Sequence, residues 1–146
     1  MRVPQIRLIV SLSCAVAPFC AGCGPAVVSK GGVVDPSDLN LAAIGRYYAQ
    51  AEQKLGRPPN NADELKPFLA PGGELSKLMV SPNDNQPYVV IWGTRIAHAP
   101  EQYMIVAYEK FGANGYRHVL TPQGTLMLTA EDFAKAAFPS GHTPGR

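Results

Sequence analysis

The sequence predicts an α+β domain in which a long N-terminal helix packs on a small three- to four-stranded antiparallel sheet. Two observations predict this fold class. Apolar residues recur at steps of three and four early in the chain, whereas short runs of β-branched and aromatic residues, separated by turn formers, follow residue 87. The chain of 146 residues suits one domain, and its 14 Gly and 14 Pro favour short elements joined by turns.

The long helix is predicted to begin after Asp35 and to end at Gly56. Asp35 is a suitable N-cap, Pro36 fits the first helical position, and Gly56 is a common helix terminator. One apolar stripe lies between them, made of Leu41, Ile44, Tyr48, Ala51 and Leu55. A helix of about 20 residues is about 30 Å long and can cover a small sheet.

Short helices are expected next. Asn61, with Glu64 three residues later, is an N-cap signal for a helix or turn that ends near Leu69, because Pro67 prevents a long one. One further helical turn is predicted over residues 74–79.

The sheet is predicted from four segments, residues 88–92, 104–108, 116–120 and 125–128. The last two flank Thr121-Pro122-Gln123-Gly124, which is typical of a hairpin turn. A closing helix capped by Thr129 is expected to run through Ala137. The domain is predicted to span residues 35–138, with a disordered tail over 139–146.

Residues 1–22 are typical of a signal peptide. Arg2 and Arg7 are basic, and residues 8–19 are mostly apolar but too few to span a bilayer about 30 Å thick. Ala21-Gly22-Cys23 follow, and this end of the segment resembles the lipobox of bacterial lipoproteins, although Cys20 stands where that pattern usually has Leu. The resemblance implies cleavage before Cys23, lipid attachment at Cys23 with palmitate-like acyl chains, and anchoring to a membrane of the cell envelope, on its periplasmic or outer face.

Residues 23–34 are accordingly predicted to be the lipidated N-terminus and a flexible tether. Two alternatives compete with the lipobox interpretation. One is an ordinary secretory signal cut near Ala21, which would release a soluble protein. The other is a redox or metal-binding Cys20-x-x-Cys23 pair, which lacks both the flanking strand and helix and a second ligand pair.

Charge and cysteine content exclude several classes of function. Without Arg2 and Arg7, the 13 Lys and Arg become 11, equal to the 11 Asp and Glu, so the mature chain has no net charge with which to bind nucleic acid. All three cysteines lie in the first 23 residues, so no disulfide or thiolate metal site is expected in the folded part.

Three segments between residues 39 and 116 resemble the globular domain of the major pseudopilins of type II secretion. Residues 56–59 (Gly-Arg-Pro-Pro) are similar to the family's Gly-x-Tyr-Pro after its long helix. Pro82, Pro87 and Tyr88 are similar to its Asp-Pro-Trp-Gly-x-Pro-Tyr element, and residues 112–115 (Gly-Ala-Asn-Gly) to its Gly-x-Asp-Gly turn. The resemblance implies a pseudopilin-like fold and a protein-interaction role related to secretion.

Two departures from that family limit what the resemblance implies. The sequence has no Phe-Thr-Leu-x-Glu prepilin segment, so filament assembly by that route is not expected. The family's calcium loop is acidic, but here Gly115 precedes Tyr116, Arg117 and His118, and calcium needs six to eight oxygen ligands. Backbone hydrogen bonding explains residues 83–85 (Asn-Asp-Asn) better than a weak ion site does. No metal and no cofactor is predicted.

No catalytic constellation is recognisable. His98, His118 and His142 lie in no known motif, and alternation places His118 on one face of its strand with Leu120. Tyr47 and Tyr48 are neighbours on the helix, so one must be at least partly exposed. An exposed aromatic beside an open sheet edge could receive a partner strand, but an inert surface tyrosine explains it more simply. The sequence favours a non-catalytic envelope lipoprotein, not an enzyme. A soluble secreted or periplasmic enzyme or ligand-binding protein is the alternative.

Overall fold

The computed structural model describes residues 35–96 and 104–145. Their elements, in chain order, are helix α1 (Pro36–Leu55), the 3₁₀ helix η1 (Ala62–Phe68), helix α2 (Leu75–Leu78), strands β1 (Val89–Val90), β2 (Ala107–Tyr108), β3 (Tyr116–Thr121) and β4 (Gly124–Thr129), and helix α3 (Ala130–Lys135). The predicted fold class is confirmed.

Helix α1 begins and ends where its capping residues predict. The Asp35 carboxylate accepts the Ser37 N–H at 2.8 Å, Pro36 occupies the first turn, and Gly56 ends the helix with a left-handed φ of 69°. Four members of the apolar stripe are buried, but Leu55, the last of them, is 42% exposed. The buried stripe therefore runs from Leu41 to Ala51 and leaves the C-terminal end of α1 outside the core.

The two short helices also follow their local signals. The Asn61 side chain accepts the N–H groups of Asp63 and Glu64 at 3.0 and 3.3 Å, so it caps η1 as predicted. Arg57 donates two hydrogen bonds of 3.0 Å to the Glu64 carboxylate, which lower the pKa of Glu64 and tie the start of the α1–η1 loop to η1.

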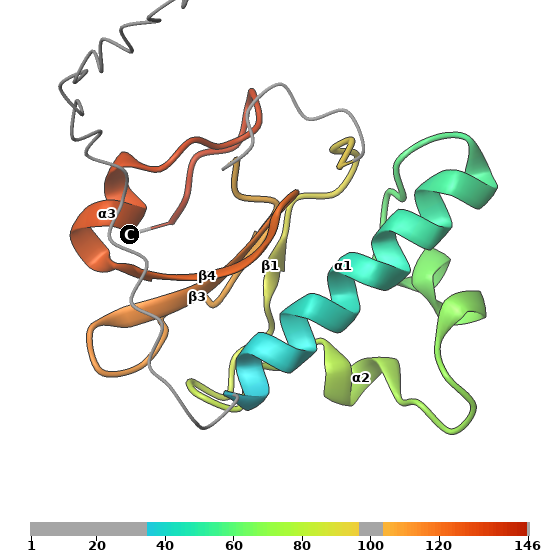
Figure 1. The fold of residues 1–146 in the computed structure, drawn as a ribbon, viewed down its shortest axis with the longest axis horizontal. Helices are drawn as coiled ribbons and strands as arrows, with labels where there is room; N and C mark the ends of the chain where they lie inside the picture. Colours follow the sequence, from blue (N-terminus) through green and yellow to red (C-terminus); the bar gives the residue numbers. More distant parts are fainter. Residues whose placement is uncertain (1–34, 97–103, 146) are drawn as a thin grey trace, which may run out of the picture.

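The four strands form one antiparallel sheet in the order β1-β2-β3-β4. Only the β3–β4 hairpin is long, with its register running from Tyr116 opposite Thr129 to Thr121 opposite Gly124. In Figure 1, α1 lies along one side of this sheet and α3 on the other. The two faces carry separate apolar clusters: Leu41 and Ile44 of α1 pack with Leu120, whereas Phe133 of α3 packs with Tyr108 and Val119. The sheet is thus covered on both faces, whereas the sequence predicted only that the long helix covers one of them.

Strands β1 and β2 are shorter than predicted. Each is extended by one residue that stays bonded in the sheet, Ile91 donating to the Val106 carbonyl, and beyond these two residues the chain takes other partners. Gly93, with a φ of 77°, turns the chain away after β1, and its N–H bonds to the Pro59 carbonyl in the loop after α1. The Ile105 N–H donates to the carbonyl of Ala137 and not to β1. Helix α3 ends at Lys135, two residues before the predicted Ala137.

Tyr48 connects the middle of α1 to the loop that follows β1. Its ring stacks on Trp92 at a centroid distance of 5.9 Å, and its hydroxyl donates to the Thr94 carbonyl at 2.8 Å. Burial raises the pKa of Tyr48 to about 12, because ionisation would place a charge inside the packed helix–loop contact.

This raised pKa predicts a loss of stability at alkaline pH. Because the folded-state pKa of Tyr48 lies above the unfolded value of 10, the contribution is complete below pH 10 and is lost as the pH rises toward about 12. In Tyr48→Phe, the free energy of unfolding measured in urea should therefore fall less across this range than in wild type. Tyr47→Phe, which alters the half-buried neighbour, should retain the full wild-type fall. An identical pH dependence in Tyr48→Phe and wild type would contradict the prediction.

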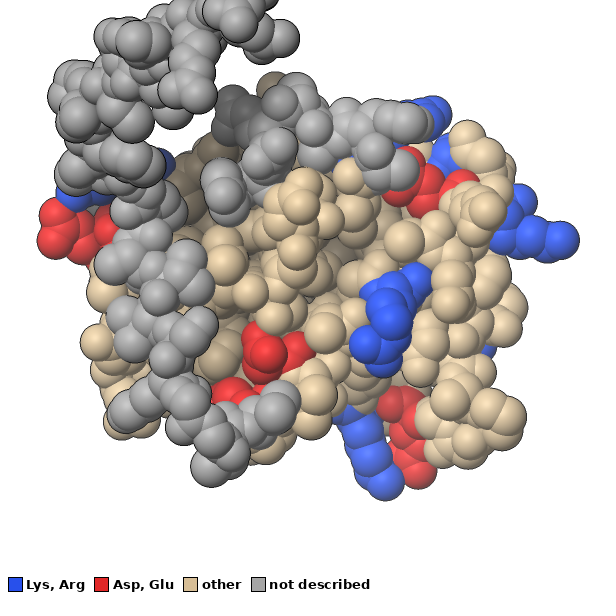
Figure 2. Space-filling view, in the orientation of Figure 1, with Lys and Arg blue, Asp and Glu red and all other residues tan. Residues whose placement is uncertain are grey.

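One face of the described residues shows no strong accumulation of one charge. Figure 2 shows basic and acidic side chains interspersed on the face in view. No helix within residues 35–96 and 104–145 combines the length and the apolar character needed to cross a membrane.

Candidate functional site

The residues singled out from the sequence fall in different parts of the molecule. Cys23, the signal segment, the tether and His98 lie outside the described residues. His118 is buried in β3, and His142 lies near the C-terminus beside Tyr108. Of the tyrosine pair, Tyr48 is buried and Tyr47 is half-buried, as expected for neighbours on one helix. The structure therefore brings no two of the three histidines together within its described part.

A buried carboxylate, Glu109, lies at the centre of a polar cluster. Glu109 directly follows β2 and is 0% exposed, as are Ser37 in the first turn of α1 and Ser81 in the loop before β1. One Glu109 oxygen, Oε1, accepts hydrogen bonds from Ser37 Oγ at 2.5 Å, Ser81 Oγ at 2.7 Å and Asn83 Nδ2 at 2.9 Å. The other, Oε2, accepts the His118 backbone N–H at 2.8 Å. Four donors thus satisfy the buried carboxylate, as a buried charge requires.

Tyr88 extends this cluster into the core. Its hydroxyl lies 2.7 Å from Ser37 Oγ, and because the single Ser37 hydroxyl hydrogen is donated to Glu109, Tyr88 must be the donor. Burial raises the pKa of Tyr88 above its usual value. The neutral phenol is therefore the form that suits this position.

His118 joins the cluster to the start of α1. Its Nε2 atom lies 3.5 Å from a carboxylate oxygen of Asp35, and its Nδ1 atom lies 4.0 Å from one of Asp38. The Nδ1 atom is buried and has no hydrogen-bond partner among the residues that the structure describes. Asp35 also accepts from the side chain of Asn83 at 3.3 Å. The imidazole therefore lies between the carboxylates of the N-cap Asp35 and of Asp38 in the first turn of α1.

Asp84 uses its carboxylate to hold the β2–β3 turn. Its Oδ2 accepts the N–H groups of Phe111 at 2.8 Å and Gly112 at 3.0 Å, and its Oδ1 accepts the Gln86 N–H at 3.0 Å. Burial alone would raise the pKa of Asp84, but these backbone donors outweigh it and the net pKa is lowered. Backbone hydrogen bonding thus accounts for Asp84, as the sequence indicated. Residues 35–96 and 104–145 contain no cluster of three or more His, Cys, Asp or Glu suited to a metal ion.

The arrangement around Glu109 combines a serine hydroxyl and a carboxylate, the pair that nucleophilic chemistry uses. Both groups are fully buried, however, and the Ser37 hydroxyl hydrogen is already donated to the carboxylate. A substrate could not reach the Ser37 oxygen without separating α1 from the sheet. The geometry therefore suits a structural polar cluster that fixes the first turn of α1.

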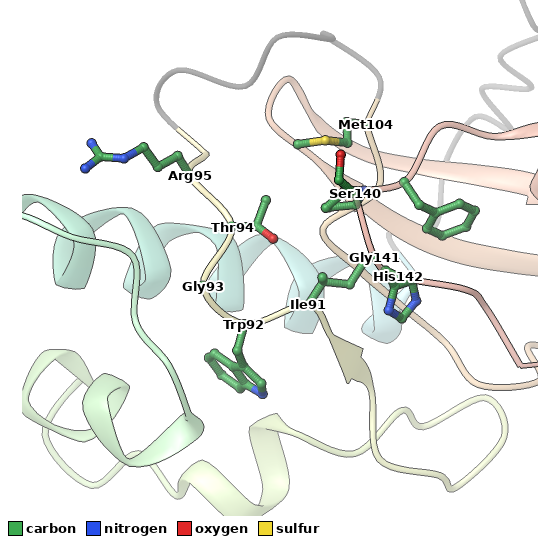
Figure 3. Close-up of a pocket in the computed structure, with 11 residues that line it drawn as sticks. Ile91, Trp92, Gly93, Thr94, Arg95, Met104, Ser140, Gly141 and His142 are labelled. Carbon is green, nitrogen blue, oxygen red and sulfur yellow. The ribbon is translucent and has the colours of Figure 1, made fainter.

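A separate cavity of about 720 Å³ lies between the segment after β1 and the C-terminal residues, and it is lined by residues 91–95, Met104 and residues 138–142. Figure 3 shows the Arg95 side chain directed away from the cavity and the Trp92 indole directed toward α1 and η1. His142 Nε2 is 3.1 Å from the Tyr108 hydroxyl. The polar groups at this cavity do not converge on one point, so its geometry assigns no chemistry to it.

Comparisons with protein-family models, with curated proteins and with solved structures find no match to this chain.

Proposed function

We propose that this chain is a non-catalytic lipoprotein of the cell envelope, anchored to a membrane through acyl chains on Cys23, and that its pseudopilin-like α+β domain makes protein contacts related to secretion. The observation that carries the proposal is the Ala21-Gly22-Cys23 sequence at the end of an apolar segment preceded by basic residues. Several acyl chains at Cys23 make attachment stable where a single chain would be marginal.

The position of Asp35 supports an anchored role. Residues 24–34 follow Cys23 and could span at most about 40 Å when fully extended. Any force on such a tether would act on Asp35 and the first turn of α1. This turn is bonded to the rest of the domain by Ser37 through Glu109 and by Asp35 through Asn83. The first turn of α1, where the tether would join the domain, is therefore hydrogen-bonded to segments distant in the sequence.

Metabolic labelling with a palmitate analogue tests the anchor. Wild-type protein should be labelled and should sediment with membranes, whereas Cys23→Ala should lose the label because the acylated sulfur is absent. Cys14→Ala, in the apolar segment, is the matched control and should label as wild type does. Mass spectrometry of the mature N-terminus should find Cys23 first. Unlabelled wild-type protein in the soluble fraction would refute the anchor and favour the secreted alternative.

The alternative is a soluble secreted or periplasmic enzyme or ligand-binding protein. The observation in its favour is the 720 Å³ cavity beside Trp92 and His142, since ligand sites are commonly concave and of about 300–1,000 Å³. The outward direction of Arg95 in Figure 3 and the bond between His142 and Tyr108 leave few polar groups free to orient a ligand there. We therefore favour the interaction role.

A further inference from the structure

Strand β4 forms one edge of the sheet, and its sequence is self-complementary. Within the described part of the chain, β3 is its sole strand neighbour. Residues 125–129 read Thr-Leu-Met-Leu-Thr, which is the same in both directions about Met127. In an antiparallel pair of two such strands centred on Met127, every residue would lie opposite a residue of the same type: Met opposite Met, Leu opposite Leu and Thr opposite Thr.

The direction of the β4 backbone groups follows from the hydrogen bonds of β3. His118 and Leu120 direct their carbonyls to β2, since these accept the N–H groups of Glu109 and Val106. The alternate residues of β3 therefore bond to β4, where their register partners are Gly124, Leu126 and Leu128. It follows that Thr125, Met127 and Thr129 direct their N–H groups away from the sheet. No described residue bonds to the outward backbone of Thr125 or Met127.

This edge lacks the features that usually prevent strand pairing. Edge strands are commonly protected by Lys, by Pro or by inward-pointing charges. Residues 124–129 contain no charged residue and no proline, and every residue from Thr125 to Thr129 is half-buried. A partner strand must therefore be uncharged and able to pair with Leu and Met side chains, which describes β4 itself.

We propose that β4 pairs antiparallel with β4 of a second copy of this chain, with Met127 opposite Met127 of the second copy and Thr125 opposite Thr129 of the second copy. The Met127 pair is a hydrogen-bonded pair, because its N–H groups point outward. In the outer pairs the Thr129 N–H donates to the Thr125 carbonyl, while the Thr129 carbonyl begins α3. Leu126 lies opposite Leu128 of the second copy and extends the apolar layer that these residues share with Phe133. This proposal rests on the interaction role of the proposed function and names the partner in that role. The pairing itself does not require an acyl chain.

The pairing forms a two-fold dimer with a continuous sheet across both copies. Its axis is perpendicular to the sheet, so the two α1 helices lie on the same face. A single pair of edge strands buries less than the roughly 800 Å² per partner of a stable interface, so the dimer should be weak in dilute solution. Confinement to a membrane would raise the effective concentration of the chains and favour it.

Disulfide crosslinking tests both the contact and its register. The full chain is used, with Cys14, Cys20 and Cys23 replaced by Ser so that introduced cysteines are its only thiols. In concentrated protein solution, where a weak dimer is populated, Met127→Cys should form a dimer on mild oxidation, because Cα atoms in a hydrogen-bonded pair are about 5.5 Å apart, within disulfide range. Thr125→Cys should remain monomeric, because the two copies of residue 125 are offset by about 13 Å along the strands in this register. The double variant with Thr125→Cys and Thr129→Cys should crosslink again.

A further variant separates strand pairing from random collision. Thr125→Pro removes an outward N–H group and leaves the bonds between β3 and β4 in place, since proline is tolerated at the solvent side of an edge strand. Added to Met127→Cys, it should suppress the crosslink while far-ultraviolet circular dichroism stays unchanged. Monomeric Met127→Cys, or equal crosslinking of Met127→Cys and Thr125→Cys, would overturn the proposal. Because these chains lack Cys23, either result leaves the labelling test of the anchor unaffected.

Discussion

Replacing Glu109 by Ala should lower the free energy of unfolding by on the order of 4 kcal/mol. Glu109 is 0% exposed, and its removal leaves Ser37, Ser81, Asn83 and the His118 N–H without their acceptor. Each buried polar group without a partner costs about 1–3 kcal/mol, and water entering the vacated space would recover only part of that loss. Urea unfolding followed by circular dichroism measures the change.

Glu109→Gln should destabilise the domain less, by about 1–3 kcal/mol. The Gln oxygen can keep the three bonds that Oε1 accepts, but its amide nitrogen then faces the His118 N–H as a second donor. The matched control is Glu131→Ala, which removes an exposed carboxylate bonded to Lys135 and should cost less than about 1 kcal/mol. Equal effects of Glu109→Ala and Glu131→Ala would show that the buried cluster contributes nothing to stability.

The position of this cluster relates stability to the proposed anchoring. Ser37, Ser81 and Glu109 join the first turn of α1, the loop before β1 and the end of β2, three segments that are distant in the sequence. Apolar packing of Leu41 and Ile44 holds α1 against the sheet but is not directional. Hydrogen bonds to a fixed carboxylate are directional, so they fix the first turn of α1, where the tether would join the domain.

Elements with local signals were predictable from the sequence. The N-cap Asp35 and the C-terminal Gly56 bound α1 at the predicted residues, and the turn over residues 121–124 joins β3 to β4 as predicted. These signals act within a few residues of the chain, so sequence alone contains them. The lengths of β1 and β2 depend instead on distant partners, such as the Ala137 carbonyl that accepts from Ile105, and periodicity carries no information about these.

The polar cluster around Glu109 was not predicted, because it too depends on residues that are distant in the sequence. Its members lie between residues 37 and 118, and each one alone resembles an ordinary capping, turn or strand residue. One signal was present: Glu109 follows residues 104–108, an unbroken apolar and aromatic run. A carboxylate that continues such a run is a candidate for burial, although its donors could be identified only from the fold.

Replacing Gly112 by Ala should destabilise the domain by at least about 3 kcal/mol, because two costs combine at this position. Gly112 has a φ of 72°, a left-handed conformation that costs an L-residue about 1–2 kcal/mol. An added Cβ would also lie 2.0 Å from the Tyr116 carbonyl oxygen and 2.7 Å from Arg117 Cγ. The Tyr116 carbonyl cannot move freely, since it accepts the Ala113 N–H at 2.9 Å.

Gly115→Ala in the same turn separates the two costs. Gly115 has a similar φ of 79°, but an added Cβ there meets no atom within 4 Å, so only the conformational cost of about 1–2 kcal/mol applies. The difference between the two variants in urea unfolding therefore measures the steric cost at Gly112. Because the Gly112 N–H also bonds to Asp84, a turn displaced by the added methyl group should lose that contact as well. Equal losses of stability in the two variants would mean that the turn can relax around the methyl group. The close approach of Gly112 to Tyr116 would then not constrain the turn between β2 and β3.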